Sequence, residues 1–207
     1  MKVTQSYDST ATLLQRIKQG ARPDVLIGTS DSIDDLGLTS IIDRSSRTFI
    51  ARVGMGVAVL REEPKPDIST VAAFVETLRS ASSVAYSKTG ASGLHFAQLI
   101  QVLGIADELN SSATLVDSGF VGDAVVAGRA DLAIQSLSEL QAVPGIEIVG
   151  PLPAVLQVYT CLVAALGTHA KEKPEAIRLI HSLVGTTAKS AYTRAGLETS
   201  RSLSEVD

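Results

Sequence analysis

The residues best suited to chemistry in this chain form a short hydroxyl-rich loop, Ser87-Lys88-Thr89-Gly90-Ala91-Ser92-Gly93. Residues 83–86 before it are typical of a strand. After it, apolar residues recur at helical spacing (Leu94, Ala97, Ile100 and Leu103) and stop at Gly104. A helix that begins in such a loop presents backbone N–H groups and hydroxyls at the positive end of its dipole. The loop therefore predicts an anion site, and as an alternative an ordinary capped helix.

Other segments repeat this pattern of small hydroxyl or glycine residues between a predicted strand and a predicted helix. They are Asp8-Ser9-Thr10 after a strand over 2–7, Gly28-Thr29-Ser30 after 25–27, and Asp117-Ser118-Gly119 after 113–116. In open α/β folds, ligands bind at the carboxyl ends of strands. The recurrence of the pattern at this one structural position predicts a cleft that receives an anion.

The elements that must position these loops alternate between strand and helix, which predicts mostly parallel sheets flanked by helices. Two long strands, over 47–60 and 157–166, can carry the chain between two lobes, and glycines within the first predict a bend. We expect lobe one to comprise residues 1–52 and 156–207, and lobe two residues 53–155. The stretch from Pro174 to about Gly196 is predicted to be helical.

Composition excludes several classes of protein. The chain has 207 residues and a net charge of −4 with scattered basic residues, which argues against nucleic acid as a partner. It has no spacing of metal ligands, no phosphate or dinucleotide fingerprint and no nucleophile elbow, so we expect no metal and no cofactor. Its opening residues do not form a signal peptide, so a chain translated as written is expected to stay in the cytoplasm.

The chain resembles the type II periplasmic solute-binding proteins, in particular the molybdate-binding-protein-like branch of ABC importers. The residues that carry this resemblance run from Ser9-Thr10-Ala11-Thr12-Leu13 through Lys18-Gln19-Gly20-Ala21-Arg22-Pro23-Asp24-Val25. They continue with Gly56-Val57-Ala58-Val59, the Ser87–Gly93 loop, Leu103-Gly104-Ile105 and Gly128-Arg129-Ala130-Asp131-Leu132-Ala133-Ile134. The chain is also similar to aconitate isomerase, an enzyme built on the same fold.

The resemblance implies a two-lobe periplasmic-binding-protein-like α/β fold from which the usual N-terminal strand and helix are missing. It also implies a small anionic ligand between the lobes, a periplasmic location and an ABC importer as partner. Neutral hydroxyls and backbone N–H groups suffice to hold an oxyanion. The positions expected to bind the ligand are Ser9, Thr10, Ser87, Thr89, Ser92, Ser118, Gly119 and Ser136. Lys88, the one cation within these loops, is expected to be solvated.

Three hypotheses about function follow. The first is a solute-binding protein for a molybdate-like oxyanion or a small organic carboxylate. The second is an isomerase that shifts a proton in a small polycarboxylate, for which His95 and Asp8 are the available acid–base groups. The third is a remnant without catalysis that completes its first sheet as a homodimer through an exposed strand edge.

Overall fold

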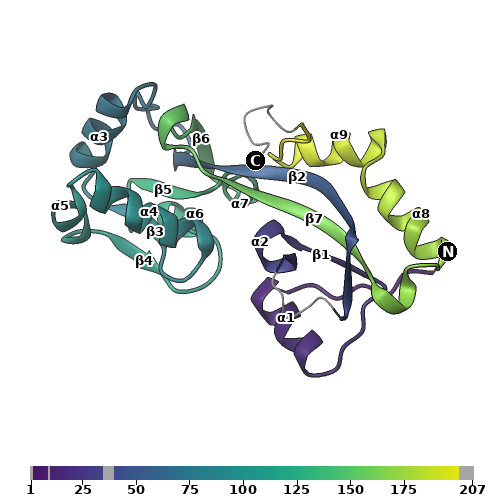
Figure 1. Ribbon diagram of the computed structural model, residues 1–207. Coiled ribbons are helices and arrows are strands. Elements are labelled where there is room, and N and C mark those ends of the chain that lie inside the picture. The colour runs from purple at the N-terminus through teal and green to yellow at the C-terminus, as the bar shows by residue number, and fades with distance from the viewer. Residues whose placement is uncertain (1, 9, 35–39, 201–207) are drawn as a thin grey trace. The chain divides into compact units, whose positions relative to one another are not determined.

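The computed structural model describes residues 2–8, 10–34 and 40–200, and the chain within them forms two compact units. Unit 1 comprises the described residues up to Arg52, Thr160–Arg194 and the residues from Glu198 on. Unit 2 comprises Val53–Tyr159 and Ala195–Leu197. The strands β2 (Ile42–Leu60) and β7 (Tyr159–Gly167) each contribute residues to both units (Figure 1).

Unit 2 is built on a sheet in the order β2-β5-β3-β4, with β6 also paired to β2. Its further strands are β3 (Val84–Ser87), β4 (Thr114–Val116), β5 (Leu132–Ser136) and β6 (Ile146–Pro151). The strands β4, β3 and β5 are parallel, whereas β2 pairs antiparallel with both β5 and β6. The predicted α/β class is confirmed, but the expectation of mostly parallel sheets holds only for these three strands. The long strand β2, which precedes their strand–helix repeat in the chain, runs antiparallel to β5.

Helices cover both faces of this sheet because its strands alternate bulky and small residues. Val84 and Tyr86 of β3 belong to one buried cluster, together with Phe74 and Phe96 of the helices on that side, while Ala85 belongs to a second cluster. The first cluster is completed by α3 (Val71–Ser80), α4 (Ala91–Val102) and α5 (Ala106–Asn110). The second is completed by α6 (Gly122–Val126) and α7 (Leu137–Gln141). A parallel sheet covered in this way presents its loops only at the strand ends.

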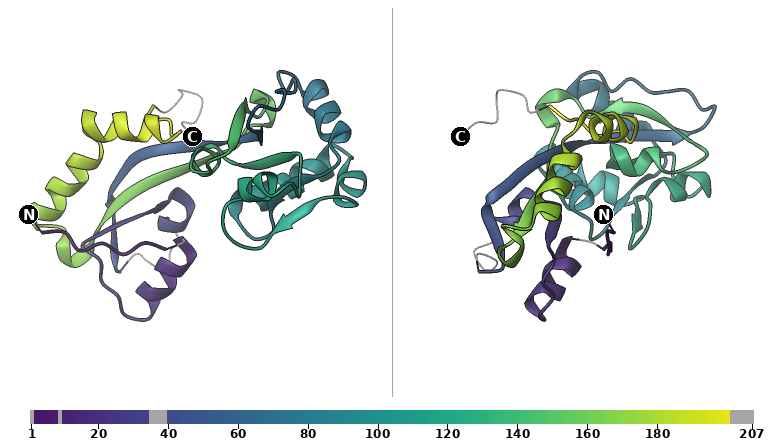
Figure 2. Two further views of the ribbon diagram at one scale, coloured as in Figure 1. Left: turned by 180° about the vertical axis from the view of Figure 1, so that it is seen from behind. Right: turned by 90° about the vertical axis from the view of Figure 1, so that its right-hand side faces the viewer.

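Unit 1 has the strand order β1-β7-β2, with β1 (Val25–Thr29) antiparallel to β7. The helices α1 (Thr10–Lys18) and α2 (Ser30–Ile33) lie beside β1 in all views (Figures 1 and 2), and Ile17, Leu26 and Ile33 share one buried cluster. The unit also holds the short 3-10 helix η3 (Thr168–Ala170), α8 (Pro174–Leu183) and α9 (Thr186–Arg194); η2 (Ala154–Leu156) belongs to unit 2.

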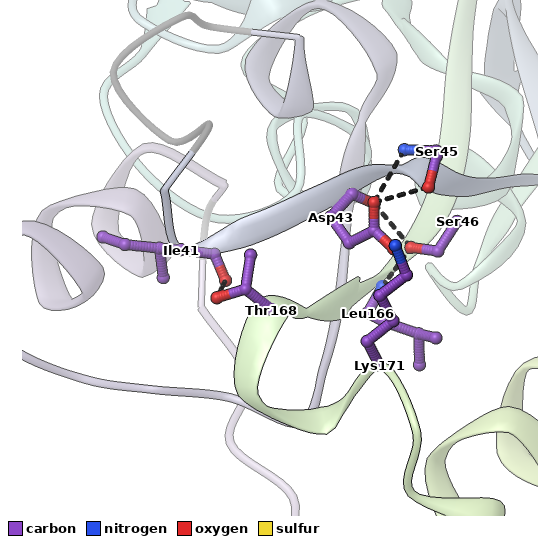
Figure 3. A network of polar contacts seen from close by, with 7 residues as sticks. All are labelled: Ile41, Asp43, Ser45, Ser46, Leu166, Thr168 and Lys171. Carbon is purple, nitrogen blue, oxygen red and sulfur yellow. Dashed lines mark hydrogen bonds and ion pairs between the residues drawn. The ribbon is translucent and has the colours of Figure 1, made fainter.

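A polar network joins the start of β2 to the end of β7 within unit 1 (Figure 3). The Asp43 carboxylate accepts hydrogen bonds from the Ser45 hydroxyl at 2.6 Å and the Ser45 N–H at 3.1 Å. The Ser46 hydroxyl donates to the Asp43 carbonyl and accepts the Leu166 N–H at 2.7 Å. The Ser45 hydroxyl is the main cause that lowers the pKa of Asp43, and the Lys171 ammonium, 3.6 Å away, adds to it. The Asp43 carboxylate therefore has a structural role.

Two further expectations are corrected by the structure. Residues 2–8 form no strand; they are exposed, Tyr7 by 80%, and their alternating pattern has no partner strand among the described residues. The predicted C-terminal helical stretch is divided into α8 and α9, because the helical conformation ends at Val184 and begins again after Gly185. The first correction matters for the site, since Asp8-Ser9-Thr10 no longer follows a strand.

Candidate functional site

The predicted loops of unit 2 meet at one edge of its sheet. Because β3, β4 and β5 are parallel, their carboxyl ends point the same way, and Ser87 is in register with Val116 of β4. The residues that follow these ends include most of the predicted binding set. Ser87, Thr89 and Ser92 follow or end β3, Ser118 and Gly119 follow β4, and Ser136 ends β5. We call this set the carboxyl-edge site.

Hydrogen bonds fix the first of these loops. The Ser87 hydroxyl accepts the Gly90 N–H at 2.9 Å, which closes the turn after β3. The Lys88 N–H donates to the Val116 carbonyl at 2.9 Å, and the Thr89 hydroxyl donates to the Asp117 carbonyl at 3.4 Å. The loops after β3 and β4 are thus tied together, and Ser87 and Thr89 use part of their hydrogen-bonding capacity on this scaffold.

The start of α4 is held unusually close to the end of β3. A Cβ atom added at Gly93 would lie 1.8 Å from the Ser87 carbonyl oxygen, a distance that no side chain can accommodate. The N-cap residue is Gly90, which offers no side chain to the N–H groups of the first helical turn. These donors therefore remain available, at the positive end of the helix dipole, for a group outside the helix.

Three hydroxyls of the carboxyl-edge site are free of internal partners. Ser92, Ser118 and Ser136 form no side-chain hydrogen bond with any residue in the described ranges, and each is at least partly accessible. A hydroxyl can both donate and accept, so these groups can adapt to a ligand oxygen. Gly119, with φ +87°, forms the turn that carries Ser118 past the end of β4.

Charge at this site is balanced by an ion pair that the sequence does not predict. The Lys88 ammonium lies 3.3 Å from the Asp117 carboxylate, and the two side chains are 59% and 78% exposed. Lys88 is accessible to solvent, as expected, but it is also paired. The sequence pattern marks Asp117 only as a turn residue, because the pairing depends on β3 and β4 being neighbours and no spacing in the sequence shows this.

The predicted site residues of unit 1 do not belong to the carboxyl-edge site. The Asp8 carboxylate accepts from the Arg16 guanidinium at 2.6 Å, so it lies in an exposed ion pair. Thr10 begins α1, and Ser9 lies outside the described residues, so a role for either in binding stays a prediction. These residues belong to unit 1 and the carboxyl-edge site belongs to unit 2.

An arginine that no sequence pattern singles out contacts α2, which follows β1 without a loop because Gly28 and Thr29 belong to β1 and Ser30 begins α2. The Arg47 guanidinium, on β2, pairs with the Asp34 carboxylate at 2.9 Å and donates to the Ser30 hydroxyl. Its side chain is 32% exposed. The contact joins residues 17 positions apart through the fold of unit 1, and no local pattern could have found it.

His95 is placed on α4, one turn beyond the helix start. Its ring is partly buried, and its Nε2 atom is buried without a hydrogen-bond partner in the described part of the chain. Such an atom ordinarily finds a water molecule or a ligand, since burying it unpaired costs free energy. His95 is therefore neither a surface residue nor a satisfied core residue.

Other chemistries find no support in the described ranges. No group of three or more His, Cys, Asp and Glu side chains there could hold a metal ion. No helix in the same ranges is long and apolar enough to cross a membrane. What the carboxyl-edge site offers is backbone N–H groups and neutral hydroxyls, which suit an anion.

A sheet flanked by helices is also the fold of the periplasmic binding proteins to which this chain is similar in structure. The chain belongs to the family of bacterial extracellular solute-binding proteins, whose model matches residues 1–198. The resemblance predicted from sequence is confirmed.

Individual proteins are also similar to this chain in sequence or in fold. The chain is 31% identical over 192 residues to an aconitate isomerase from a Pseudomonas species, covering 92% of this chain and 73% of that protein. In fold it is similar to the substrate-binding domain of a putative molybdenum ABC transporter from Clostridium difficile. The TM-score is 0.75 at 16% identity, with 97% of this chain and 87% of the other covered. The periplasmic molybdate-binding protein of Azotobacter vinelandii gives a TM-score of 0.69 at 21% identity, with 93% and 85% covered.

Proposed function

We propose that this protein binds a small anion, an oxyanion or an organic carboxylate, at the carboxyl-edge site of unit 2. The observation that carries the proposal is the start of α4, where N–H groups without a side-chain cap lie beside the free hydroxyl of Ser92. Ser118 and Ser136, from the neighbouring strand ends, supply further hydroxyls. Fixed dipoles of this kind stabilise an anion without a full countercharge.

Two kinds of ligand are consistent with this chemistry. The structural neighbours named for molybdenum and molybdate favour a tetrahedral oxyanion. The relative named aconitate isomerase is closer in sequence and favours a small carboxylate.

We further propose that the protein is periplasmic and delivers its ligand to an ABC importer. The family description and the molybdenum transporter to which one structural neighbour belongs both support this.

The test is calorimetric titration with molybdate, tungstate, sulfate, phosphate, citrate and the two aconitate isomers. We expect one of them to bind, and the double variant Ser92→Ala, Ser136→Ala to weaken its affinity about tenfold or more, at about 1 kcal/mol for each lost hydrogen bond. Ser112→Ala is the matched control, because this exposed serine lies before the amino end of β4. Equal affinity of wild type and double variant would show that the anion binds elsewhere.

The second candidate function is isomerisation of a small polycarboxylate. Two observations favour it: 31% identity to an aconitate isomerase, and the buried, unpartnered Nε2 of His95. In such a reaction a base removes a proton from the carbon next to a carboxylate. The double bond then shifts, and the proton returns at the far end of the allylic system.

This candidate is tested by following cis- and trans-aconitate by proton NMR in the presence of the protein. Turnover that His95→Gln abolishes, while anion binding persists, would support His95 as the proton-transferring group. Binding of both isomers without interconversion would leave the protein a binder and rule the isomerase out.

A further inference from the structure

A cavity in unit 2 lies away from the carboxyl-edge site. It has a volume of about 580 Å³ and lies at the amino ends of β3 and β5, beside the carboxyl ends of β2 and α3. Because β3 and β5 are parallel, their amino ends form the opposite edge of the sheet from Ser87 and Ser136. The cavity is therefore a separate feature of unit 2. Its size falls in the usual range for small-molecule sites.

The lining of this cavity carries one sign of charge. Glu63, Glu76 and Asp131 line it, and no lysine, arginine or histidine does. The three carboxylates form no ion pair with any described residue; Glu76 accepts from the Ser80 hydroxyl and Asp131 from the Ser82 N–H. Of the basic residues nearby, Lys65 pairs with Glu147 and Arg79 with Glu108. Arg61 and Arg129 adjoin the lining residues Leu60 and Ala130 in the chain but do not line the cavity.

The helix α3 adds to this negative character. Its last turn, with Thr77 and Ser80, lines the cavity, and the residue after the helix is extended, so no capping turn covers the final carbonyl groups. The carboxyl end of a helix carries partial negative charge and leaves acceptors without donors. Of the lining residues, Val59, Ala130 and Leu132 are buried, whereas the three carboxylate residues are exposed. A carboxylate rim above an apolar floor fits a ligand with a cationic head and a hydrocarbon body.

We propose that this cavity binds a small organic cation, an alkylamine or alkylguanidine. Its head group lies among Glu63, Glu76, Asp131 and the last carbonyls of α3, and its hydrocarbon chain lies on Val59, Ala130 and Leu132. The site is independent of the anion site, since it lies at the other edge of the sheet and has the opposite charge. The inference does not rest on the proposed function.

The matched probes are n-butylguanidinium and n-butylurea, which have nearly the same shape and differ in charge. We expect n-butylguanidinium, titrated at millimolar concentration into the 207-residue chain, to shift the backbone amide NMR signals of the lining residues. We expect n-butylurea to bind at least fivefold more weakly. The double variant Glu76→Gln, Asp131→Asn is expected to weaken the cation about tenfold, from exposed pairs worth up to about 1 kcal/mol each.

Controls keep the test decisive. Glu147→Gln removes a surface carboxylate outside the cavity and should leave binding unchanged. Glu63→Gln replaces a carboxylate on an exposed loop, and it provides a second variant if the double variant does not fold. The proposal is overturned by equal binding of the two probes, by signal shifts outside the lining residues, or by variants that bind the cation as tightly as wild type.

Discussion

Single residues at the carboxyl-edge site do two different tasks. Ser87 and Thr89 form the scaffold through their hydrogen bonds to Gly90 and Asp117, whereas Ser92 keeps its hydroxyl free. The sequence assigns all three equally to ligand binding, because a hydroxyl in a loop has the same sequence signature in both tasks. Only the hydrogen-bond partners separate them. The contribution of Ser87 and Thr89 to binding stays a prediction.

Gly93 is the residue on which the position of α4 depends. Gly93→Ala would place a Cβ atom 1.8 Å from the Ser87 carbonyl oxygen, so the helix must move away from β3. We expect a loss of about 3 kcal/mol in the free energy of unfolding, measured by urea titration. Gly150→Ala is the control, because its added Cβ would meet its nearest neighbour at an ordinary 3.7 Å. Equal stability of the two variants would contradict the close approach.

The ion pair of Lys88 and Asp117 predicts how the anion site responds to charge. Asp117→Asn removes a carboxylate near the proposed ligand and releases the Lys88 ammonium. We expect anion affinity to rise about threefold at low ionic strength and less in high salt, because both side chains are exposed. Asp107→Asn, an exposed carboxylate on α5, should change nothing. A fall in affinity for Asp117→Asn would place the ligand away from Lys88.

At the scale of elements, the sequence pattern locates most strands and helices within a few residues. Alternation and helical spacing are informative for β3, α4, β5 and β7, because their buried residues follow the period of the element. The failure over residues 2–8 has a physical cause. A strand needs a hydrogen-bonded neighbour, and a short alternating segment has the same pattern whether or not one exists.

The N-cap of α3 likewise depends on a contact that the sequence pattern does not reveal. Ser69 and Thr70 both precede α3 and both carry a hydroxyl, but the structure assigns the cap to Thr70, whose hydroxyl accepts the Ala73 N–H at 3.1 Å. Thr70→Ala should lower the free energy of unfolding by about 1 kcal/mol in thermal or urea unfolding. Ser69→Ala should cost clearly less. The reverse order would place the cap at Ser69.

Titration of Asp24 tests the contact between the start of β1 and the segment that contains η3 and α8. The Lys173 ammonium, at 2.8 Å, lowers the pKa of Asp24 below its usual 3.8, and His169 at 2.9 Å contributes. A lowered pKa in the folded state adds stability above the unfolded-state value, and this stability is lost as the pH falls through the folded value.

Asp24→Asn should therefore be less stable than wild type at pH 6, by less than about 1 kcal/mol because the group is exposed. The difference should shrink as the pH falls below about 4. Urea unfolding across this pH range measures it. A difference that is constant with pH would show that the carboxylate charge plays no part.

For the whole molecule, the tail after α9 is connected to β2 by an ion pair and by backbone bonds. Arg52, with a side chain only 8% exposed, pairs with the Glu198 carboxylate at 2.9 Å, and the two backbones exchange hydrogen bonds of 2.8 Å. Glu198→Ala removes the carboxylate from a buried guanidinium and should cost about 2 kcal/mol of unfolding free energy.

Glu198→Gln should cost less, since an amide oxygen can still accept from Arg52. The control is Glu175→Ala, which breaks an exposed pair with Arg178 and should cost under about 0.5 kcal/mol. If both alanine variants are equally stable, the tail contributes little to unit 1. No sequence pattern predicts the contact, because it joins residues 146 positions apart.

The pairing of β1 with β7 has a consequence for how the chain folds during its synthesis. Register pairs Val25 with Leu166, and β7 is the one partner strand of β1 among the described strands. By contrast, the continuous stretch Val53–Tyr159 holds nearly all of unit 2. On the ribosome, unit 2 can therefore complete its sheet while the earlier-made β1 still waits for a neighbour. The strand β1, although it precedes unit 2 in the chain, thus folds after it, the reverse of the usual order for successive domains.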